Sequence, residues 1–420
     1  MKYTNLTKEQ LKELLDSAKK EYDEIAAKGY KVDIARGKPC NAQAALAFNM
    51  LTAPEAEDYP MSYLNYGMPE GIPEMRKLFA ELLGLEPSQV IVGGNSSLNM
   101  MYDAVQRAMQ FGLLGEKPWN KCEKVRFLCP VPGYDRHFAV TQHFGIDMIN
   151  VPMDDNGPNM DLVESLVAND ESVKGIWCVP KYSNPTGIVY SDEVVERLAT
   201  MKTAAKDFRI FWDNAYCVHE LTDTPAQLAN IMTIAKKAGT EDRIFEFAST
   251  SKITVAGAGV ACMGASETNI KDAMSHIFYQ TIGNDKVNQY RHFRFLQSVD
   301  HIKEIMDAQR AIIKPKFDAI VSTLEESLGD DCDIAKWTNP KGGYFISLDV
   351  LDGCASRVAQ LCKAAGLTLT GAGATYPYGR DDNDRNLRIA PTYTNGEDVG
   401  VAAEILVACV KLACLEKLAK

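Results

Sequence analysis

The chain has 420 residues, of which 46% are hydrophobic and 24% are charged, and its formal net charge is −11. Single hydrophobic cores stop growing near ~250–300 residues, so we expect a globular chain of this length to form two domains. The acidic balance, without a lysine- or arginine-rich run, argues against a nucleic-acid partner. No stretch approaches the ~20 apolar residues of a membrane helix and no signal-peptide core is present, so we expect no membrane partner and a cytoplasmic location.

The eleven cysteines are scattered between Cys40 and Cys414, and none forms a C-x-x-C pair. An odd number without metal-ligand spacing predicts free thiols in a reduced chain rather than a disulfide framework or a zinc site. The six histidines show no metal-binding spacing such as H-E-x-x-H, so we expect no metal ion.

The first predicted element is a helix over residues 7–28. Thr7 can cap its start, with Gln10 in the capping-box position, and Gly29 can end it. A second helical period covers residues 71–85. We expect the first of these helices to join the C-terminal part of the chain.

Short apolar runs, each followed by a polar or glycine-rich turn, predict strands at residues 90–94, 126–130, 175–180, 209–215, 243–249 and 259–266. Helical patterns separate most of these runs, for example at residues 191–206 and 224–238. Alternating strands and helices predict a mostly parallel sheet that is covered by helices on both faces.

The last part of the chain has a different pattern. A long helical period covers residues 300–328, and a strand pattern follows at 342–350. A helix is predicted near residues 355–365, a strand at 386–393, and a closing helix from Gly396 onward. This arrangement predicts a smaller α/β domain at the C-terminus.

Ligands of open α/β sheets bind at the carboxyl ends of the strands, so the polar residues there are candidates for a site. Ser96 and Ser97 follow the first strand and open a helix, where amides and hydroxyls can bind an anion, although a plain turn with a helix cap is the alternative. Asn184 precedes a proline in the turn after a later strand, and the tetrapeptide alone is more typical of an ordinary loop.

Two charged residues at strand ends have stronger interpretations. Asp213 ends an apolar strand, where a carboxylate is costly to bury without a partner, so it either caps a helix or faces a cation such as a protonated ring nitrogen. Lys252 is the one charged residue between Glu246 and Glu267, and it lies among small residues. Such surroundings favour a neutral, reactive amine, and the alternative is a lysine that extends to the surface.

The order and spacing of these residues resemble the fold-type I aminotransferases that use pyridoxal phosphate, on the positions Asn184, Asp213, Tyr216, Lys252 and Arg388. The resemblance covers nearly the whole chain and is carried by the phrases "ARGKP", "YGMPEGIPEMRKLFA", "WCVPKYSNPTG", "ASTSKIT" and "LRIAPTY". It is closest to the branch of aspartate aminotransferases that is related to the effector domains of MocR-type regulators.

The resemblance implies an α/β fold of fold-type I. A large pyridoxal phosphate-binding domain, residues 50–300, would hold a mostly parallel mixed sheet flanked by helices. Residues 1–49 together with 301–420 would form a smaller α/β domain. The resemblance also implies a homodimer with shared active sites.

The resemblance further assigns roles to residues near the cofactor ring. Lys252 would carry pyridoxal phosphate as a Schiff base and then move the proton at the substrate Cα. Asp213 would pair with the pyridine nitrogen and keep it protonated, which makes the ring an electron sink. Asn184 and Tyr216 would hydrogen-bond the phenolate oxygen of the ring, and Tyr134 would stack on the ring.

Other residues would hold the phosphate and the substrate. The phosphate ligands implied are Ser96, Ser97, Ser249 and Ser251, with Tyr66 reaching the phosphate of the neighbouring subunit. Arg388 would bind the substrate α-carboxylate with its two-pronged guanidinium group, and Gly37 and Asn184 would contact the same carboxylate.

Two departures from the family pattern are visible. Most relatives place a phosphate-binding arginine eight residues after the lysine, where this chain has Val260, or Gly259 if the loop is shifted by one. The stacking aromatic is the second departure, because the usual position can fall on Val131 or Pro132, with Tyr134 as the available aromatic residue.

We therefore predict an aminotransferase that moves an amino group from aspartate to a 2-oxo acid such as 2-oxoglutarate in a ping-pong reaction. A β-lyase type of pyridoxal phosphate enzyme and a non-catalytic regulator are the alternatives; the regulator would carry a DNA-binding domain ahead of Gly37. A dicarboxylic substrate needs a second cation, and the candidates are Arg36, Lys38, Arg136, Arg291 and Arg294. The polar and basic segment 280–295 either crosses toward a neighbouring active site or is a solvated loop.

Overall fold

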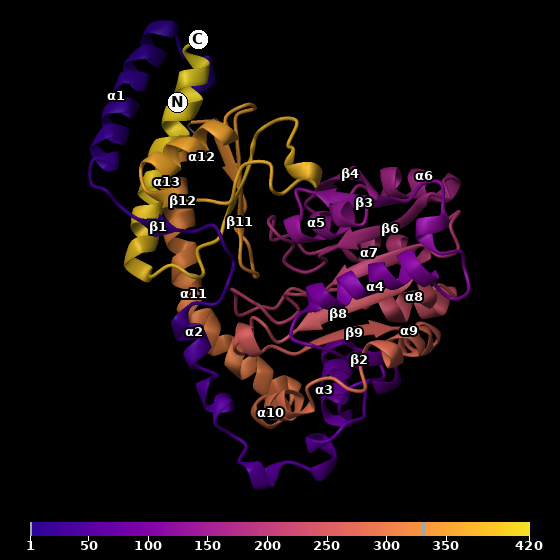
Figure 1. Ribbon diagram of the computed structural model, residues 1–420. Helices are drawn as coiled ribbons and strands as arrows, with labels where there is room; N and C mark the ends of the chain where they lie inside the picture. Colours follow the sequence, from indigo (N-terminus) through magenta and orange to yellow (C-terminus); the bar gives the residue numbers. More distant parts are fainter. Residues whose placement is uncertain (1, 330–331) are drawn as a thin grey trace.

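The computed structural model describes residues 2–329 and 332–420. An eight-stranded sheet, in the order β2-β9-β8-β7-β6-β3-β4-β5, forms the centre of the larger part of the molecule (Figure 1). Its strands are β2 (Val90–Val92), β3 (Arg126–Val131), β4 (Asp147–Asp154), β5 (Gly157–Pro158), β6 (Val173–Cys178), β7 (Arg209–Asp213), β8 (Ile244–Ser249) and β9 (Ala261–Ala265).

The central strands of this sheet run parallel, from β4 through β3, β6 and β7 to β8. Antiparallel pairing occurs toward the edges, where β9 opposes both β2 and β8 and β5 opposes β4. The predicted mostly parallel sheet is therefore confirmed. Strand β4 was missed by the sequence patterns because only one of its residues, Val151, is fully buried, so it lacks a continuous apolar run.

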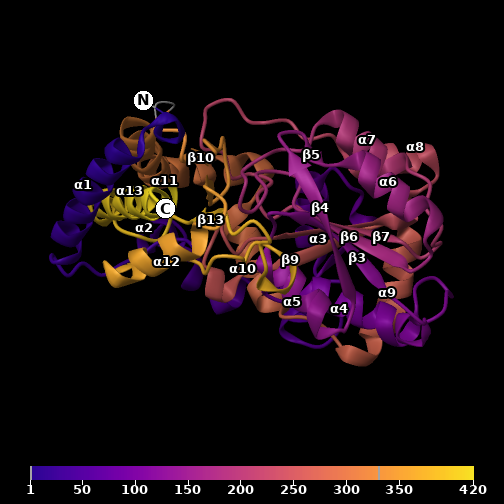
Figure 2. The same ribbon diagram turned by 90° about the horizontal axis from the view of Figure 1, so that it is seen from above.

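Helices cover both faces of the large sheet, as Figure 2 shows. One face carries α4 (Ser97–Phe111), α5 (Asp135–His143) and α9 (Glu267–Gln280), and the other carries α6 (Met160–Asn169), α7 (Asp192–Thr200) and α8 (Ile231–Ala238). The predicted helix over residues 224–238 is wrong in its first half. Asn230 accepts a hydrogen bond from the Thr233 amide and thereby caps α8, so the preceding residues form a loop.

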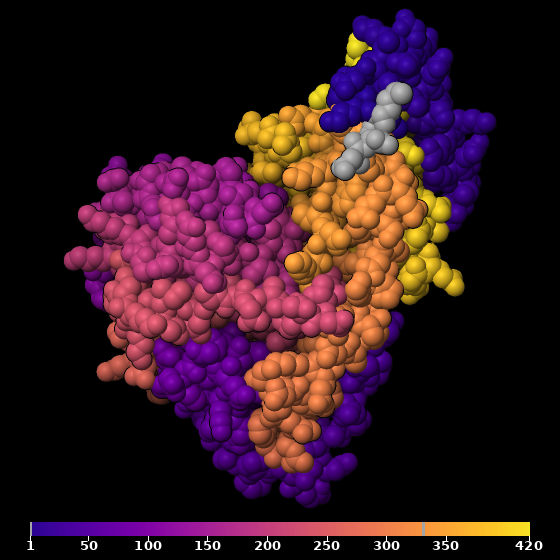
Figure 3. All heavy atoms as spheres, turned by 180° about the vertical axis from the view of Figure 1, so that it is seen from behind, coloured from indigo at the N-terminus to yellow at the C-terminus, as the bar shows by residue number. Residues whose placement is uncertain are grey.

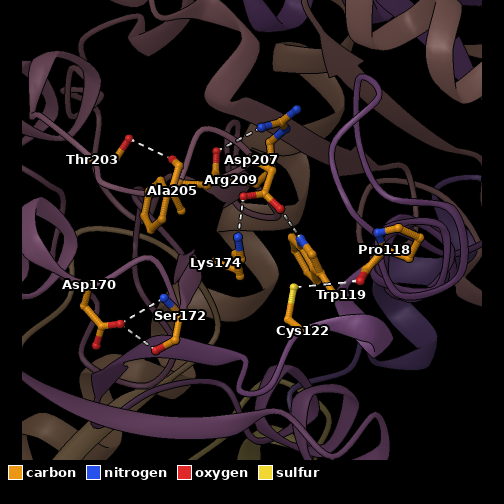
Figure 4. A network of polar contacts seen from close by, with 11 residues as sticks. Pro118, Trp119, Cys122, Asp170, Ser172, Lys174, Thr203, Ala205, Asp207 and Arg209 are labelled. Atoms are coloured by element: carbon orange, nitrogen blue, oxygen red, sulfur yellow. Dashed lines mark hydrogen bonds and ion pairs between the residues drawn. The ribbon is translucent and has the colours of Figure 1, made fainter.

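A buried polar network closes the amino-terminal edge of the sheet (Figure 4). The Asp207 carboxylate accepts hydrogen bonds from Trp119 Nε1 at 2.7 Å and from Lys174 Nζ at 2.6 Å. Arg209, at the start of β7, is buried beside this network. The Asp207 carboxylate is thus satisfied by Trp119 and Lys174, whereas Arg209 Nε is buried without a partner among the described residues.

Two of the remaining helices, α3 (Pro73–Leu83) and α10 (Lys286–Leu296), pack beside β2 and β9 of the large sheet. The smaller part and the connection to it are formed by α1 (Lys8–Ala26), β1 (Val32–Asp33), α2 (Asn41–Ala45), α11 (Val299–Leu328), β10 (Ala335–Trp337), β11 (Ile346–Val350), α12 (Ala355–Ala364), β12 (Leu367–Thr368), β13 (Asn386–Ile389) and α13 (Gly396–Leu418). Strand β11 pairs with β10 and β13 in an antiparallel sheet, and β1 pairs with β12.

The N-terminal helix packs on the C-terminal helix, as expected from the sequence. Thr7 and Gln10 form the predicted capping box of α1, and Leu11 and Ala18 of α1 share a cluster with Leu415 of α13. The indigo N-terminal segment accordingly lies beside the yellow C-terminal segment in Figures 1 and 3. The division of the chain at residues 49/50 and 300/301 stays a prediction.

The structure also describes the state of the thiols and the character of the helices. All eleven cysteines have free thiols, as their scattered positions predicted. Over residues 2–329 and 332–420, no helix combines the length and the apolar character that crossing a bilayer requires.

Candidate active site

The predicted ring-binding and substrate-binding residues gather at the carboxyl edge of the large sheet. Asp213 ends β7, Lys252 follows β8, and Asn184 lies in the loop after β6. Arg388 lies on β13 of the small sheet, yet its Nη1 atom is 3.4 Å from Asn184 Oδ1. The site therefore combines residues from the eight-stranded sheet with Arg388 from the three-stranded sheet.

Asp213 is only 2% exposed, and its two carboxylate oxygens have different surroundings. Oδ2 lies 2.9 Å from His137 Nε2, whereas Oδ1 is buried without a hydrogen-bond partner among the described residues. Because an unpaired buried carboxylate oxygen is costly, this atom indicates a missing cationic or donating group. A protonated pyridine nitrogen is a group of that kind.

His137 was not predicted from the sequence, although it lies only three residues after Tyr134. Its ring stacks on Trp177 with a centroid separation of 4.5 Å and an interplanar angle of 12°. Trp177 in turn donates a hydrogen bond to the Thr141 hydroxyl at 2.7 Å. The packing and the hydrogen bond hold the imidazole in a fixed orientation behind Asp213.

Lys252 lies over two aromatic rings. Its Nζ atom is 4.8 Å from the ring centroid of Tyr216 and 5.9 Å from that of Tyr344. Burial lowers the pKa of the Lys252 amine, and the charge of Asp213 opposes this shift. The amine is therefore more easily neutral, and more nucleophilic, than that of an exposed lysine.

A second unpredicted histidine shares these aromatic neighbours. The His219 ring lies 5.6 Å from both the Tyr216 and the Tyr344 rings, and both of its nitrogens are buried without a partner among the described residues. Burial, followed by the charge of Lys252, lowers the pKa of His219 to about 3. This imidazole is therefore neutral near neutral pH and adds no charge beside the lysine.

Tyr134 caps the start of α5 and lies at the Asp213 end of the site. Its ring meets the His137 ring edge-on at 4.9 Å, and burial, followed by the charge of Asp213, raises the pKa of its hydroxyl. Tyr134 therefore lies close to the place where a ring paired with Asp213 would bind. Tyr216 is also buried, and burial raises the pKa of its hydroxyl.

Arg388 has several polar partners in this site. Nη1 donates to Asp135 Oδ1 at 2.7 Å and to Asn184 Oδ1 at 3.4 Å, and Nη2 donates to the Thr370 hydroxyl at 3.3 Å. The guanidinium also lies 5.0 Å from the centroid of the Phe345 ring. The planar, many-donor group is thereby held at a fixed position, as binding of a carboxylate requires.

Gly37 also lies against the Phe345 ring. A Cβ atom added at Gly37 would stand 2.3 Å from Phe345 Cζ, so only glycine fits there without moving the ring. The predicted neighbourhood of Gly37 and Arg388 is consistent with this shared contact with Phe345.

The predicted phosphate ligands have no hydrogen bond from a cationic side chain among the described residues. Ser249 donates to Ser251 Oγ at 3.1 Å, and Ser251 lies 3.3 Å from the Asn95 carbonyl. Ser96 is the N-cap position of α4, but its side chain makes no capping hydrogen bond, and Ser97 is the first residue of the helix. Hydroxyls and the amides of a helix N-terminus suit a phosphate group.

The missing arginine has a structural explanation. Val260 is buried in the cluster that includes β2 and α3, so its side chain faces the core. A Cβ atom at Gly259 would lie 2.9 Å from Ser251 Oγ and 3.0 Å from the Asn95 carbonyl oxygen. A side chain at position 260 therefore faces the core, and a side chain at position 259 would press on Ser251 and on the Asn95 carbonyl unless these moved.

Tyr66 is the predicted residue that the structure does not bring into this site. Its side chain is 81% exposed, and Met61, Leu64, Phe278 and Tyr279 are also largely exposed. The turn that carries Tyr66 is held by Lys286, whose Nζ donates to the Gly67 carbonyl at 2.9 Å.

Comparison with known proteins identifies the family. The model of the family described as aspartate amino-transferase matches residues 6–420. The chain belongs to the aspartate aminotransferase family. This family member is 46% identical to a curated relative from Mycolicibacterium smegmatis over 425 residues, which cover 100% of the chain and 99% of the relative.

Two comparisons with Corynebacterium glutamicum support the same family. A relative named aspartate aminotransferase is 44% identical over 406 residues, which cover 96% of this chain and 94% of the relative. The crystal structure of an aspartate transaminase has a TM-score of 0.97 at 42% identity, covering 100% of this chain and 99% of that one. This aspartate aminotransferase family member is thus a pyridoxal phosphate-dependent aminotransferase, and the predicted fold class, enzyme class and cofactor are confirmed.

Proposed function

We propose that the enzyme transfers the amino group of aspartate to 2-oxoglutarate, and that the residues at the carboxyl edge form its active site. The full-length likeness to a relative named aspartate aminotransferase supports the substrate. A single buried atom supports the placement of the cofactor, because Asp213 Oδ1 has no partner among the described residues.

The proposed roles are those implied by the family resemblance, and the geometry of the site supports them. When bound, pyridoxal phosphate supplies an electron sink that makes the Cα–H bond of an amino acid acidic. Lys252 would hold the cofactor, and its amine, whose lowered pKa favours the neutral form, would move the proton at the substrate Cα. Asp213, supported by His137, keeps a negative charge against the ring nitrogen. Tyr134 covers one face of the ring.

The other residues bind and orient. Arg388 and Gly37 bind the substrate α-carboxylate, and Asn184 and Tyr216 hold the phenolate side of the ring. The phosphate is bound by neutral donors, which are Ser96, Ser97, Ser249, Ser251 and the amides that open α4. Each of these donors contributes little alone, but several of them converge on one group.

The second carboxylate of aspartate needs a cation, and the candidates differ in their surroundings. Lys38 Nζ lies 3.6 Å from the centroid of the Tyr393 ring, and Arg294 Nη1 donates to the Tyr290 hydroxyl at 3.3 Å. Arg136 lies two residues after Tyr134, in the first turn of α5. We propose Arg136 as the first of the five to test.

The substrate assignment is tested with purified enzyme, pyridoxal phosphate and a panel of amino acids with 2-oxoglutarate as acceptor. We expect aspartate to be the preferred donor, and Arg136→Ala to raise the KM for aspartate more than the KM for a monocarboxylic donor. Activity with aromatic or aliphatic donors alone would contradict the dicarboxylate assignment. Release of pyruvate or ammonia in place of amino transfer would favour the β-lyase alternative.

We further propose a homodimer in the cytoplasm. The exposed Tyr66 and its apolar neighbours Met61, Leu64, Phe278 and Tyr279 support a contact surface for a second copy, and the free thiols fit a reducing compartment. Sedimentation at several concentrations tests the dimer. Mixing Lys252→Ala with Tyr66→Phe subunits then tests sharing, because hybrid dimers would contain one site with both residues intact.

A further inference from the structure

A carboxylate of the chain itself already contacts the proposed substrate-binding arginine. Asp135 Oδ1 is 2.7 Å from Arg388 Nη1, and the two side chains are 34% and 8% exposed, respectively. Asp135 is the first residue of α5 and comes directly after Tyr134. It is therefore more open to solvent than the guanidinium with which it pairs.

The Asp135 carboxylate binds the Nη1 atom of the guanidinium, which is one of the atoms that a substrate carboxylate would use. Arg388 Nε is buried without a partner among the described residues, whereas both Nη atoms have partners. Nη2 donates to Thr370, and Nη1 is the atom that holds both Asp135 and Asn184. A carboxylate bound in a bidentate manner needs two neighbouring N–H groups. Asp135 thus occupies part of the edge that a substrate carboxylate needs.

We propose that Asp135 determines specificity as an internal competitor for the carboxylate site of Arg388. This inference rests on the proposed role of Arg388. In the free enzyme Asp135 neutralises a buried cation, which would be costly to leave unpaired. A substrate carboxylate takes its place, or shares the guanidinium against the repulsion of the Asp135 charge.

The consequence is discrimination between ligands. Asp135 is tethered next to Arg388, so it competes at a high effective concentration. A simple carboxylate has no other anchor in the site and gains little by replacing one ion pair with another. A substrate that is also held through the cofactor and its side chain can displace Asp135. Asp135 therefore excludes simple anions from the site.

The alternative role for Asp135 is only to position Arg388, and the two roles predict opposite changes in affinity. Asp135→Asn keeps an oxygen that can accept a hydrogen bond but removes the charge. If Asp135 competes, this variant binds acetate and maleate more tightly, by about 10-fold, as expected for the loss of one charged partner. If Asp135 only positions Arg388, the variant binds both more weakly.

The test measures the Kd of acetate and of maleate by isothermal titration calorimetry on the cofactor-loaded enzyme. Asp147→Asn is the matched control, because Asp147 pairs with Lys124 on the surface at the start of β4. We expect the control to behave as the wild type. Asp135→Ser is a second variant if Asp135→Asn proves unstable, and it should show the same direction of change.

The outcomes separate this inference from the proposed function. Unchanged or weaker binding by Asp135→Asn and Asp135→Ser overturns the competitor role. Arg388→Ala should lose most of the affinity for maleate. If Arg388→Ala binds maleate as the wild type does, the assignment of the substrate carboxylate to Arg388 is wrong. If Arg388→Ala loses binding and the Asp135 variants do not gain it, only the competitor role fails.

Discussion

The two ends of the proposed cofactor site are built differently. At the ring-nitrogen end, the Asp213 carboxylate is held by His137, which stacks on Trp177. At the phosphate end, Ser249 and Ser251 lie beside Asn95 and α4, and no cation stands where most relatives are expected to have one. A full charge is thus kept where electrons move during the reaction. Where the group is only bound, several neutral donors replace a charge.

Removal of Lys252 is expected to have the largest effect on kcat. Lys252→Ala should lower kcat by at least about 10³-fold, because both the covalent attachment and the proton transfer are lost. The variant should also lose the visible absorbance of the attached cofactor, yet still bind pyridoxal phosphate through the two ends. Turnover and absorbance spectra measure both effects. Retention of a covalent cofactor by the variant would show that another residue attaches it.

The charge at the ring-nitrogen end is tested by Asp213→Asn. Asparagine keeps the shape of the side chain but cannot stabilise a protonated ring nitrogen, so we expect kcat to fall by about 10²–10³-fold. Cofactor affinity should change much less, because the phosphate end is intact. Single-turnover rates and equilibrium dialysis separate the two effects. An Asp213→Asn variant with nearly normal kcat would remove the proposed difference between the ends.

The phosphate end should respond in the opposite way. Ser249→Ala and Ser251→Ala each remove one neutral donor, so we expect each to raise the Kd for pyridoxal phosphate by about 2–10-fold. At saturating cofactor, kcat should stay close to that of the wild type. Thr233→Ala, at the start of α8 on the other face of the sheet, is a matched control for loss of a hydroxyl. A loss of affinity above 100-fold would mean that one serine acts as a charged ligand would.

The sequence predicted the parts of this site that lie at strand ends. Asp213 and Lys252 were found because a lone charge beside a buried strand is costly and needs an explanation. His137 and Asp135 were missed, because they lie on a helix and their importance depends on side chains that are 76 and 253 positions away in the sequence. The proposed role of Tyr66 requires a second copy of the chain, which a single sequence does not place.

The sequence also predicted some elements of the fold and missed others. Strands with continuous apolar runs, such as β7, were found close to their true limits, whereas the half-exposed β4 was missed. The family pattern also showed that Gly259 and Val260 stand where most relatives are expected to have a phosphate-binding arginine. The cause of this departure, the core-facing Val260 and the close approach of Gly259 to Ser251, depends on packing that spacing alone does not contain.

A second buried carboxyl group near the ring-nitrogen end contrasts with Asp213. Glu246, on β8, accepts a 3.3 Å hydrogen bond from Asn214, the residue that follows Asp213, but no cation faces it among its described partners. Burial raises the pKa of Glu246 from 4.5 to about 8, so the group is mostly protonated in the folded chain at neutral pH. Asp213 therefore has a close polar partner in His137, whereas burial away from water is the main influence on Glu246.

This difference predicts a pH-dependent stability. In the unfolded chain Glu246 ionises near pH 4.5, so between pH 4.5 and about 8 unfolding releases its proton, and the free energy of unfolding falls as the pH rises. Glu246→Gln removes this dependence and should be more stable than the wild type at pH 8, by roughly 1–3 kcal/mol, with little difference at pH 5. Urea unfolding at both pH values measures the change. Glu416→Gln is the control of opposite sign: Arg357 lowers the pKa of Glu416 from 4.5, so this pairing stabilises the chain at both pH values and its loss should destabilise the chain at both. Equal stability of Glu246→Gln and the wild type at pH 8 would show that Glu246 is solvated, and the contrast with Asp213 would then be lost.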